Sequence, residues 1–354
     1  MSGKISHLAI LCVRNEGAFL LEWLAHHRAI GFDHVLVFSN DCDDGTDAML
    51  DRLQALGGVT HIRNDGPYEK GGIQFTALKA AADLELVQQA DWILPLDVDE
   101  FVNIHCRDHS LAALHAALPE ATAITLTWRL FGSADRVRYE DRPVTEAFTR
   151  CAPAVMHWPW RAAMFKTLYR NDGTYAQPGV HRPRGPNPKQ LGQARWFDSH
   201  GRPLPDLFKT RRIFSTYGRQ NYGLAQINHY PLGAMESYVL KADRGRAVHS
   251  DQMLGLDYWV ERNFNIETDT SINATAPARD QELATLKTDP ALATLHEAAV
   301  EWRRARFDAL MQQDPFRALF GRLLMAPPSR PVTAKAAGFM VKFARRDRER
   351  KRQQ

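Results

Sequence analysis

The sequence is organised around one stretch, Asp91-Trp92-Ile93-Leu94-Pro95-Leu96-Asp97-Val98-Asp99-Glu100-Phe101. Its apolar run, residues 92–96, has the length of one buried strand and ends abruptly in three carboxylates. Because ligands of open α/β sheets collect at the carboxyl ends of the strands, we expect the chemistry of the protein at this point.

Asp97 and Asp99 are separated by a single residue, and their charges repel each other unless a cation or a proton joins them. With a diphosphate completing the coordination shell, such hard oxygen ligands suit Mg²⁺ or Mn²⁺. The alternative interpretation is a polar loop after a core strand, and the rest of the sequence has to decide between the two.

The composition is that of an ordinary soluble globular protein, with 44% hydrophobic and 24% charged residues in a chain of 354. The four cysteines have no metal-like spacing, which predicts free thiols in a reducing cytoplasm. Residues 342–352 carry seven basic and two acidic side chains, so the net charge of +4 lies in this segment and the rest of the chain is near neutral. A general basic surface for nucleic acid is therefore not expected.

In the first 100 residues, short apolar runs typical of strands alternate with segments whose apolar residues recur at helical spacing. Apolar, β-branched runs predict strands, and amphipathic spacing closed by glycines predicts helices. The predicted strands are 5–13, 33–39, 59–63 and 92–96, and the predicted helices follow residue 17, at 46–56 and at about 74–89. This order predicts an α/β fold with a mostly parallel sheet flanked by helices. A further strand is expected at 123–130 and a helical pattern at about 280–324.

Polar residues follow each of these strands within a residue or so. They are Arg14, Asn15 and Glu16, then Asn40, Asp41, Asp43 and Asp44, then Asn64 and Asp65, and finally Asp97 and Asp99. Turn geometry alone explains one such loop. Four of them at one edge of one sheet indicate a ligand site.

Glycine-rich phosphate cradles of the dinucleotide and P-loop kinds are absent from the sequence. The charge of a phosphate-bearing ligand would then be met by a metal ion and by arginine or lysine side chains. Carboxylates in the other strand-end loops suit a nucleoside, because they accept hydrogen bonds from base N–H groups and ribose hydroxyls.

Three segments together resemble the GT-A glycosyltransferases, specifically the family 2-like group and its relatives in family 92. They are Val13-Arg14-Asn15-Glu16 with Glu22-Trp23-Leu24-Ala25-His26-His27, Phe38-Ser39-Asn40-Asp41 with Asp44-Gly45-Thr46, and Leu96-Asp97-Val98-Asp99-Glu100-Phe101. The resemblance covers about residues 5–105 and is much fainter between 106 and 225. Later, Asn228-His229-Tyr230-Pro231 and Ser237-Tyr238-Val239-Leu240-Lys241 resemble a C-terminal segment of the same group.

The resemblance implies a Rossmann-like GT-A fold, a nucleotide-sugar donor such as a UDP-sugar, and inverting transfer of the sugar to an acceptor hydroxyl in cell-surface glycan or polysaccharide synthesis. Asp97, Asp99 and His229 would hold Mn²⁺ or Mg²⁺, although His229 taken alone reads as a structural histidine. The residues assigned to the nucleotide sugar are Arg14, Asn15, Glu16, Asn40, Asp41, Asp44, Asp65, Asp97, Lys166 and Lys241.

The segment 156–215 is dense in histidine, tryptophan, arginine and proline, and two interpretations stay open. Its aromatic rings suit sugar faces and its arginines suit phosphate, or else it is a packing loop around buried tryptophans. Lys166, Arg182 and Lys241 are candidates for binding the diphosphate. The candidates for the general base are His181, Asp198 and Glu236, among which the sequence does not choose.

Apolar residues precede the basic run of the tail, which suits a peripheral contact with anionic lipid at the inner face of the membrane. We therefore expect a glycosyltransferase domain at 1–245, with a nucleotide-sugar half at 1–105 and an acceptor half at 106–245. A helical extension at 246–326 and a basic tail at 327–354 would follow. The acceptor would be a glycan, a lipid-linked saccharide or a protein.

Two other functions remain open. A nucleotidyltransferase would use a similar sheet and carboxylates, but it usually has a glycine-rich basic loop after the first strand, and Arg14-Asn15-Glu16-Gly17 matches that loop poorly. A non-catalytic sugar- or nucleotide-binding homologue would explain the unassigned base.

Overall fold

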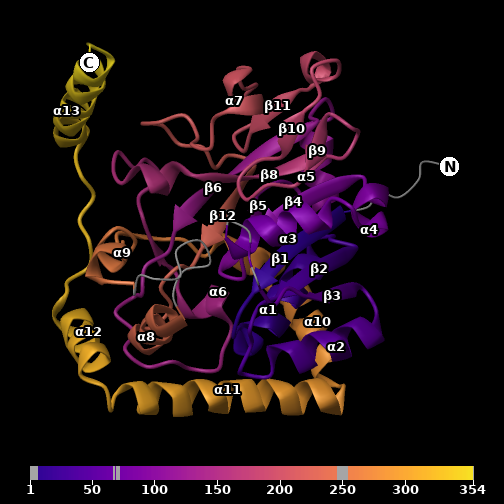
Figure 1. Cartoon of the computed structure of the whole chain (residues 1–354), viewed down its shortest axis with the longest axis vertical. Helices are drawn as coiled ribbons and strands as arrows, with labels where there is room; N and C mark the ends of the chain where they lie inside the picture. Colours follow the sequence, from indigo (N-terminus) through magenta and orange to yellow (C-terminus); the bar gives the residue numbers. More distant parts are fainter. Residues whose placement is uncertain (1–6, 67, 69–71, 245–253, 354) are drawn as a thin grey trace.

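The structure, a computed structural model, describes residues 7–66, 68, 72–244 and 254–353. A central sheet lies between helices, and the long helix of residues 290–310 runs along the bottom of the molecule, with the helices that follow it at the left (Figure 1).

The first part of the chain alternates strands and helices. Its elements are β1 (His7–Val13), α1 (Gly17–Ala29), β2 (His34–Ser39), α2 (Thr46–Leu56), β3 (Val59–Arg63), α3 (Ile73–Ala81), α4 (Glu85–Gln89), β4 (Trp92–Leu96) and β5 (Glu100–Ile104). The four strands predicted for this region and the helix predicted at 46–56 are confirmed, except that residues 5 and 6 of the first predicted strand lie outside the described residues.

The single helix predicted over 74–89 is wrong, because α3 ends at Ala81 and α4 begins at Glu85. Between them Leu84 adopts an extended backbone, with φ −79° and ψ 134°. The break turns the chain so that Leu84 and Val87 pack in the same core cluster as Leu78.

The middle of the chain is built from shorter elements. They are α5 (Leu111–Ala117), β6 (Ala123–Leu130), α6 (Val144–Ala147), β7 (Arg150–Cys151), η1 (Trp160–Ala163), β8 (Phe165–Arg170), β9 (Tyr175–Gln177), β10 (Arg184–Pro186), η2 (Leu191–Gln193), β11 (Trp196–Asp198), α7 (Leu207–Thr210) and β12 (Ala225–His229). The strand predicted at 123–130 is confirmed as β6.

The last part of the described chain is mainly helical. It contains α8 (Met235–Arg244), α9 (Leu256–Val260), β13 (Glu267–Thr268), η3 (Ser271–Thr275), α10 (Ala276–Lys287), α11 (Pro290–Leu310), α12 (Asp314–Met325) and α13 (Ala334–Gln353). In the described part of the chain, no helix combines the length and the apolar character that crossing a membrane requires.

The strand order of the central sheet is β3-β2-β1-β4-β8-β6-β12-β5, and β11 pairs with β6. The first four strands are mutually parallel, whereas β8 is antiparallel to both β4 and β6. It follows that β4 and β6 run in the same direction, as does β12, which is parallel to β6. The carboxyl ends of β1, β2, β3, β4, β6 and β12 therefore meet at one edge, and the predicted α/β class with a mostly parallel sheet is confirmed.

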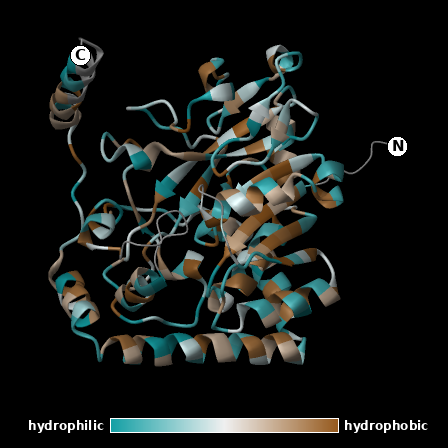
Figure 2. Cartoon of the chain, viewed as in Figure 1, coloured by the Kyte–Doolittle hydropathy of each residue, from teal (hydrophilic) through white to brown (hydrophobic). Residues whose placement is uncertain are grey.

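Buried side chains cover both faces of the sheet. One core cluster joins α1 and α2 to it, and a second joins α3 and α4. The strands β1, β2 and β4 are coloured largely as hydrophobic in Figure 2, as expected for strands buried on both faces of a sheet. Trp23 of α1 is completely buried and donates its ring N–H to the carbonyl of Glu100 (2.9 Å), which ties α1 to the start of β5.

The packing interpretation of the segment 156–215 is confirmed for one of its tryptophans, whereas the interpretation as a sugar- and phosphate-binding segment stays a prediction. Trp196 is 1% exposed and its ring lies 6.1 Å from that of Tyr175 in the core, as the packing interpretation predicts. Trp160 is 40% exposed, and its ring meets that of Trp158 at 5.2 Å. Of these rings, that of Trp160 is the most open to solvent.

The long helix α11 is held against the sheet domain at three points along its length (Figure 1). At its start Asp289 pairs with Arg52 of α2, and near its end Arg306 pairs with Asp243 of α8 (2.8 Å). Between them Ala299 packs on Gly17, where a Cβ atom would lie only 2.8 Å from the Ala299 Cβ. The absence of a side chain at Gly17 is what allows α11 to approach the start of α1.

We expect Gly17→Ala to destabilise the protein by about 1–3 kcal/mol, because the added methyl group overpacks the contact with Ala299. The matched control is Gly321→Ala in α12, where a Cβ atom would meet nothing within 4 Å. There alanine should be neutral or stabilising, by up to about 1 kcal/mol, through its higher helix propensity. Urea unfolding followed by circular dichroism measures both, and equal stability of Gly17→Ala and the parent chain would contradict the packing argument.

Candidate active site

The loops after β2 and β3 contact each other at the carboxyl edge of the sheet. Asn64 donates its side-chain amide to Asn40 Oδ1 (2.6 Å), and Asp65 Oδ1 accepts from the backbone N–H of Asp41 (3.2 Å). The hydroxyl of Tyr68 donates to Asp41 Oδ2 (2.8 Å). The two loops thus form one continuous polar surface.

The loop after β1 adjoins this surface. Asn15 Oδ1 accepts from the backbone N–H of Asp43 (2.7 Å). Glu16 forms an ion pair with Arg244 of α8, and the same guanidinium donates to the carbonyl of Arg14 (2.7 Å). Sequence analysis did not single out Arg244, which connects a late helix to the first loop of the chain.

Asp44 has a structural role in its loop. It is 4% exposed, and its two oxygens accept from the backbone N–H groups of Gly17 and Thr46, each at 2.9 Å. These bonds satisfy the first N–H groups of α1 and α2. Asp41 and Asp65, which are also assigned to the nucleotide sugar, are exposed.

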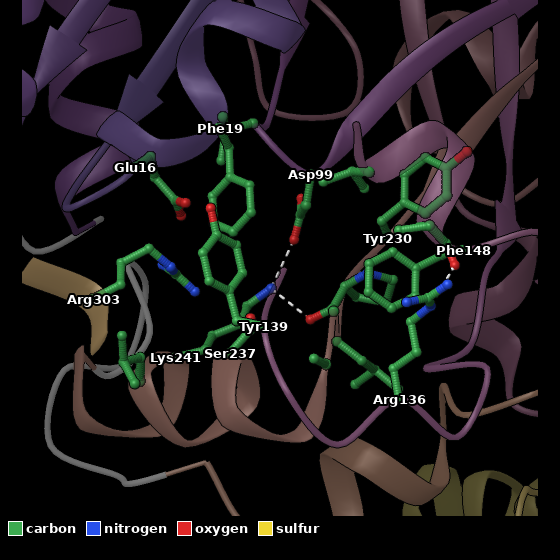
Figure 3. A pocket seen from close by; sticks show the side chains of 18 of the residues that line it. Glu16, Phe19, Asp99, Arg136, Tyr139, Phe148, Tyr230, Ser237, Lys241 and Arg303 are labelled. Atoms are coloured by element: carbon green, nitrogen blue, oxygen red, sulfur yellow. Dashed lines mark hydrogen bonds and ion pairs between the residues drawn. The ribbon is translucent and has the colours of Figure 1, made fainter. Parts of the chain in front are cut away.

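Two lysines balance the carboxylates at the end of β4. Lys166 of β8 is completely buried, with its Nζ 3.0 Å from Asp97 Oδ2 and 3.3 Å from Glu100 Oε2. Lys241 of α8 places its Nζ 2.7 Å from Asp99 Oδ2 (Figure 3). Burial lowers the pKa of Lys166, but the two carboxylates raise it by more, so its pKa lies above the ordinary value and the side chain is charged.

Glu100 is the central residue of this arrangement, and sequence analysis did not assign it a role. It is completely buried and accepts hydrogen bonds from the Trp128 ring N–H (2.6 Å) and from the backbone N–H of Asp97 (2.8 Å). Burial raises the pKa of Glu100 and Lys166 acts against this rise; because Trp128, Lys166 and the backbone N–H of Asp97 all donate to it, these contacts fit the ionised carboxylate. The only sequence signal for Glu100 was its place directly after Asp97 and Asp99. Its contacts could not be predicted, because Trp128 and Lys166 are distant in sequence.

Asp99 and His229 lie next to each other, with His229 Nε2 3.6 Å from Asp99 Oδ1. Burial alone would raise the pKa of Asp99, but the positive charge of Lys241 lowers it well below the usual range. Burial lowers the pKa of His229 to about 3. The His229 ring packs on Trp128 at 4.3 Å, and its Nδ1 has no hydrogen-bond partner among the described residues.

Within the described residues, no group of three His, Cys, Asp or Glu side chains is arranged to hold a metal ion. Asp97 is directed elsewhere, because Gln74 donates to its Oδ1 (2.5 Å) and Lys166 to its Oδ2. Asp99 and His229 remain as an oxygen and a nitrogen donor side by side. This pair fits a cation whose other ligands come from a diphosphate and water, and not a cation held by protein side chains alone.

A pocket of about 990 Å³, including its open mouth, adjoins Asp99. Its walls come from the start of α1, from α8, from the segment 136–148 and from α11, as Figure 3 shows for the side chains of several of these segments. Glu16, Asp99 and Lys241 lie on its border, so the carboxylate end of β4 opens directly into it.

The three candidates for the general base have different surroundings. Asp198 is 1% exposed and both its oxygens accept from Arg202, while Glu236 accepts from the backbone N–H of Tyr139 (2.8 Å). His181 makes its hydrogen bond through Nδ1, to the carbonyl of Phe165 (3.0 Å), which leaves Nε2 as a proton acceptor. Burial lowers the pKa of His181 to about 4, so the ring is neutral at pH 7.

Comparison with known proteins gives similarity to glycosyltransferases over part of the chain. No protein-family model matches it. Over 151 residues, which are 41% of this chain and 25% of the relative, it is 24% identical to a glycosyltransferase family 92 protein of Oryza sativa subsp. japonica. Over 108 residues, 29% of this chain and 18% of the relative, it is 28% identical to a family 92 protein of Ricinus communis.

The chain thus spans a quarter or less of the length of the curated relatives it matches. The resemblance to family 92 glycosyltransferases that the three sequence segments indicated is confirmed by these relatives. Among solved structures, residues 1–349 of S. aureus TarS in complex with UDP-GlcNAc align over 90% of this chain and 89% of that one, with 14% identity and a TM-score of 0.34. The galactosyltransferase LgtC aligns over 34% of this chain and 46% of that one, with 18% identity and a TM-score of 0.24.

The contact between Lys166 and Glu100 yields a test of the charge balance. We expect Lys166→Met to destabilise the protein by about 3–5 kcal/mol, because it leaves two carboxylates without their buried counter-charge. Adding Glu100→Gln, which removes one of those charges and keeps an acceptor for Trp128, should restore part of the loss. Urea unfolding of the two single variants and the double variant gives the coupling energy, and strictly additive effects would contradict the pairing.

Proposed function

We propose that the protein is a glycosyltransferase that moves a sugar from a nucleotide-sugar donor to an acceptor hydroxyl. The observation that carries the proposal is the Asp99–His229 pair, at the carboxyl edge of a mostly parallel sheet and at the border of an open pocket. The polar loops after β1, β2 and β3 lie along the same edge, where a nucleoside would bind. The similarity to family 92 glycosyltransferases supports this assignment.

In this proposal the nucleoside lies on the loops after β2 and β3. The carboxylates of Asp41 and Asp65 accept hydrogen bonds from base N–H groups or ribose hydroxyls, and Asn15 and Glu16 border the diphosphate. A UDP-sugar is the donor that we propose to test first.

Asp99 and His229 would hold Mn²⁺ or Mg²⁺ together with the diphosphate. When bound, such a cation stabilises the negative charge on the departing nucleoside diphosphate. Lys241 and Arg244 place two further positive charges at the same border of the pocket, where they would stabilise the same leaving group.

The acceptor hydroxyl has to lose a proton as it attacks the anomeric carbon. Among the three candidates for the base we propose His181, because its Nε2 is the acceptor nitrogen of a neutral ring. Asp198 and Glu236 are engaged in the protein's own hydrogen bonds. We propose inversion as the stereochemical course, as the family resemblance implies.

The proposed donor site makes the effect of a nucleotide on thermal stability depend on Asp99. We expect one of UDP, GDP and CDP to raise the melting temperature only when Mn²⁺ is present, since a ligand that binds the folded state alone stabilises it. Asp99→Asn should lose this shift, measured against its own melting temperature without ligand, and should lose sugar transfer. Asp308→Asn, which changes an exposed aspartate of α11, should keep both.

A full nucleotide shift in Asp99→Asn, or in excess EDTA, would contradict the proposed role of the carboxylate. Nucleotide binding without transfer to any acceptor would instead favour a non-catalytic binding protein.

We also propose that α13 contacts an anionic membrane surface. Figure 1 shows this helix standing away from the sheet. Phe339 and Phe343 are 63% and 54% exposed, with their rings 5.0 Å apart, and the sequence places the basic run of residues 342–352 on the same helix. Apolar side chains beside basic ones match a surface of acyl chains and anionic headgroups.

We expect the protein to co-sediment with phosphatidylserine-containing vesicles at low salt and to be released at high salt. Phe339→Ser with Phe343→Ser should weaken this binding. The control is Leu324→Ser with Met325→Ser, which removes two side chains of α12 that are 52% and 77% exposed. Equal sedimentation of the two double variants would count against α13 as the contact.

A further inference from the structure

The pocket beside Asp99 has more positive than negative charge in its walls. Four acidic side chains line it, and each already has an ion-pair partner: Glu16 pairs with Arg244, Asp99 with Lys241, Glu140 with Arg136 and Asp243 with Arg306. Six basic side chains line it, namely Arg136, Arg138, Arg142, Lys241, Arg244 and Arg303. Arg138, which is exposed, and Arg303, which is buried, have no carboxylate within ion-pair distance among the described residues.

Arg303 is the unusual member of this set. It is 7% exposed, and it forms no hydrogen bond or ion pair with the described residues; its buried Nε has no partner. Its guanidinium lies 4.5 Å from the centre of the Phe19 ring and 5.0 Å from that of Tyr139. Figure 3 shows it entering the pocket beside Tyr139, from the side of Glu16.

A buried guanidinium without a hydrogen-bond acceptor is costly, and burial lowers the pKa of Arg303. Two aromatic faces compensate part of this cost through cation–π contacts but leave the guanidinium, and its buried Nε in particular, without hydrogen-bond acceptors among the described residues. An oxyanion in the pocket would supply them. Arginine is well suited to this because its planar fork matches phosphate and carboxylate oxygens in pairs.

The position of Arg303 is fixed by the packing of α11. Ala299 is completely buried against Gly17, and residues four apart lie on the same face of a helix. Arg303 therefore faces Phe19, one turn of α11 beyond the contact with the start of α1. The helical region after residue 246 thus contributes a charged side chain to a pocket that the sheet domain only partly encloses.

The residues that line the pocket also indicate which of the two substrates, the nucleotide-sugar donor or the acceptor, would bind there. They include Asn15, Glu16 and Asp99, but none of the polar residues after β2 and β3 that we assign to the nucleoside. The pocket thus borders the proposed diphosphate site at Asn15, Glu16 and Asp99 without including the nucleoside loops. Its aromatic side chains, among them Phe19, Tyr139, Phe148, Tyr230 and Trp302, suit the apolar faces of a sugar ring.

We propose that this pocket binds an acceptor saccharide that carries a phosphate or a carboxylate, and that Arg303 binds this anionic group. The inference rests on the proposed glycosyltransferase function and adds to it the chemical class of the acceptor. Arg303 is then a specificity residue for the acceptor, supplied by a helix outside the region of family resemblance.

The test compares the binding of glucose 6-phosphate, glucuronate and glucose to the full chain by isothermal titration calorimetry. We expect at least one charged sugar to bind about tenfold or more tightly than glucose. Arg303→Gln should weaken the binding of the charged sugar by about 10–100-fold and so remove its advantage over glucose. This range is that of a hydrogen-bonded contact to a charged group. Its melting temperature without ligand should not fall, because the variant removes an unpaired buried charge.

Arg304→Gln is the matched control. It removes the same charge from the next position of α11, where the side chain is 57% exposed and lies 3.7 Å from Glu301, and it should bind the charged sugars as the parent chain does. Arg303→Lys keeps the charge but loses the planar fork, and we expect it to keep the fold and to bind the anion more weakly.

A separate titration with UDP and Mn²⁺ shows whether Arg303 binds the diphosphate of the donor or the anionic group of the acceptor. Unchanged UDP binding in Arg303→Gln, together with lost preference for the charged sugars, supports the proposal. Weaker UDP binding in that variant would overturn it, because Arg303 would then bind the donor diphosphate. Equal binding of charged and neutral sugars to the parent chain would also overturn it. A chain that binds the charged sugars through Arg303 but binds no nucleotide would contradict the proposed function and not the anion site.

Discussion

Three carboxylates in four consecutive residues at the end of a buried strand require positive charge from elsewhere in the chain. Asp97 and Glu100 obtain it from Lys166 of β8, and Asp99 obtains it from Lys241 of α8. Glu100 is completely buried, and the side chains of Asp97 and Asp99 remain 33% and 23% exposed, so Lys166 is above all the counter-charge that the buried Glu100 requires. The strongest electrostatic feature of the site is therefore also a constraint on how the first 100 residues join the rest of the chain.

The same turn divides the carboxyl edge of the sheet into two regions. On one side, the loops after β2 and β3 form a polar surface of amides and carboxylates. On the other, α1, α8, α11 and the segment 136–148 enclose a pocket with aromatic walls and surplus positive charge. Asp99 lies at the border of this pocket and contacts His229, where we propose that the two bound molecules meet. This division is the physical basis for assigning a nucleotide to one region and an acceptor to the other.

Prediction from the sequence succeeded where the signal was local. The strands β1 to β4 and the helix α2 follow from hydrophobic period and glycine positions, and the gathering of strand-end loops follows from their parallel order. The helix predicted over 74–89 failed because nothing in its composition marks the break at Leu84, which tertiary packing decides. Asp44 was assigned to the nucleotide sugar because it is a carboxylate in a loop at a strand end, but its oxygens accept hydrogen bonds from the N–H groups that begin α1 and α2.

By itself the sequence determined the α/β class and the strands β1 to β4 with the helices α1 and α2 between them, since these depend on neighbours along the chain, and it predicted the end of β4 as the site. The tertiary structure alone decided which charges compensate one another. Lys166 reaches Asp97 from 69 residues away, Lys241 reaches Asp99 from 142, and Arg303 reaches Phe19 from a helix near the end of the chain. Periodicity carries no information about such contacts, because they depend on how strands and helices far apart in sequence are packed side by side.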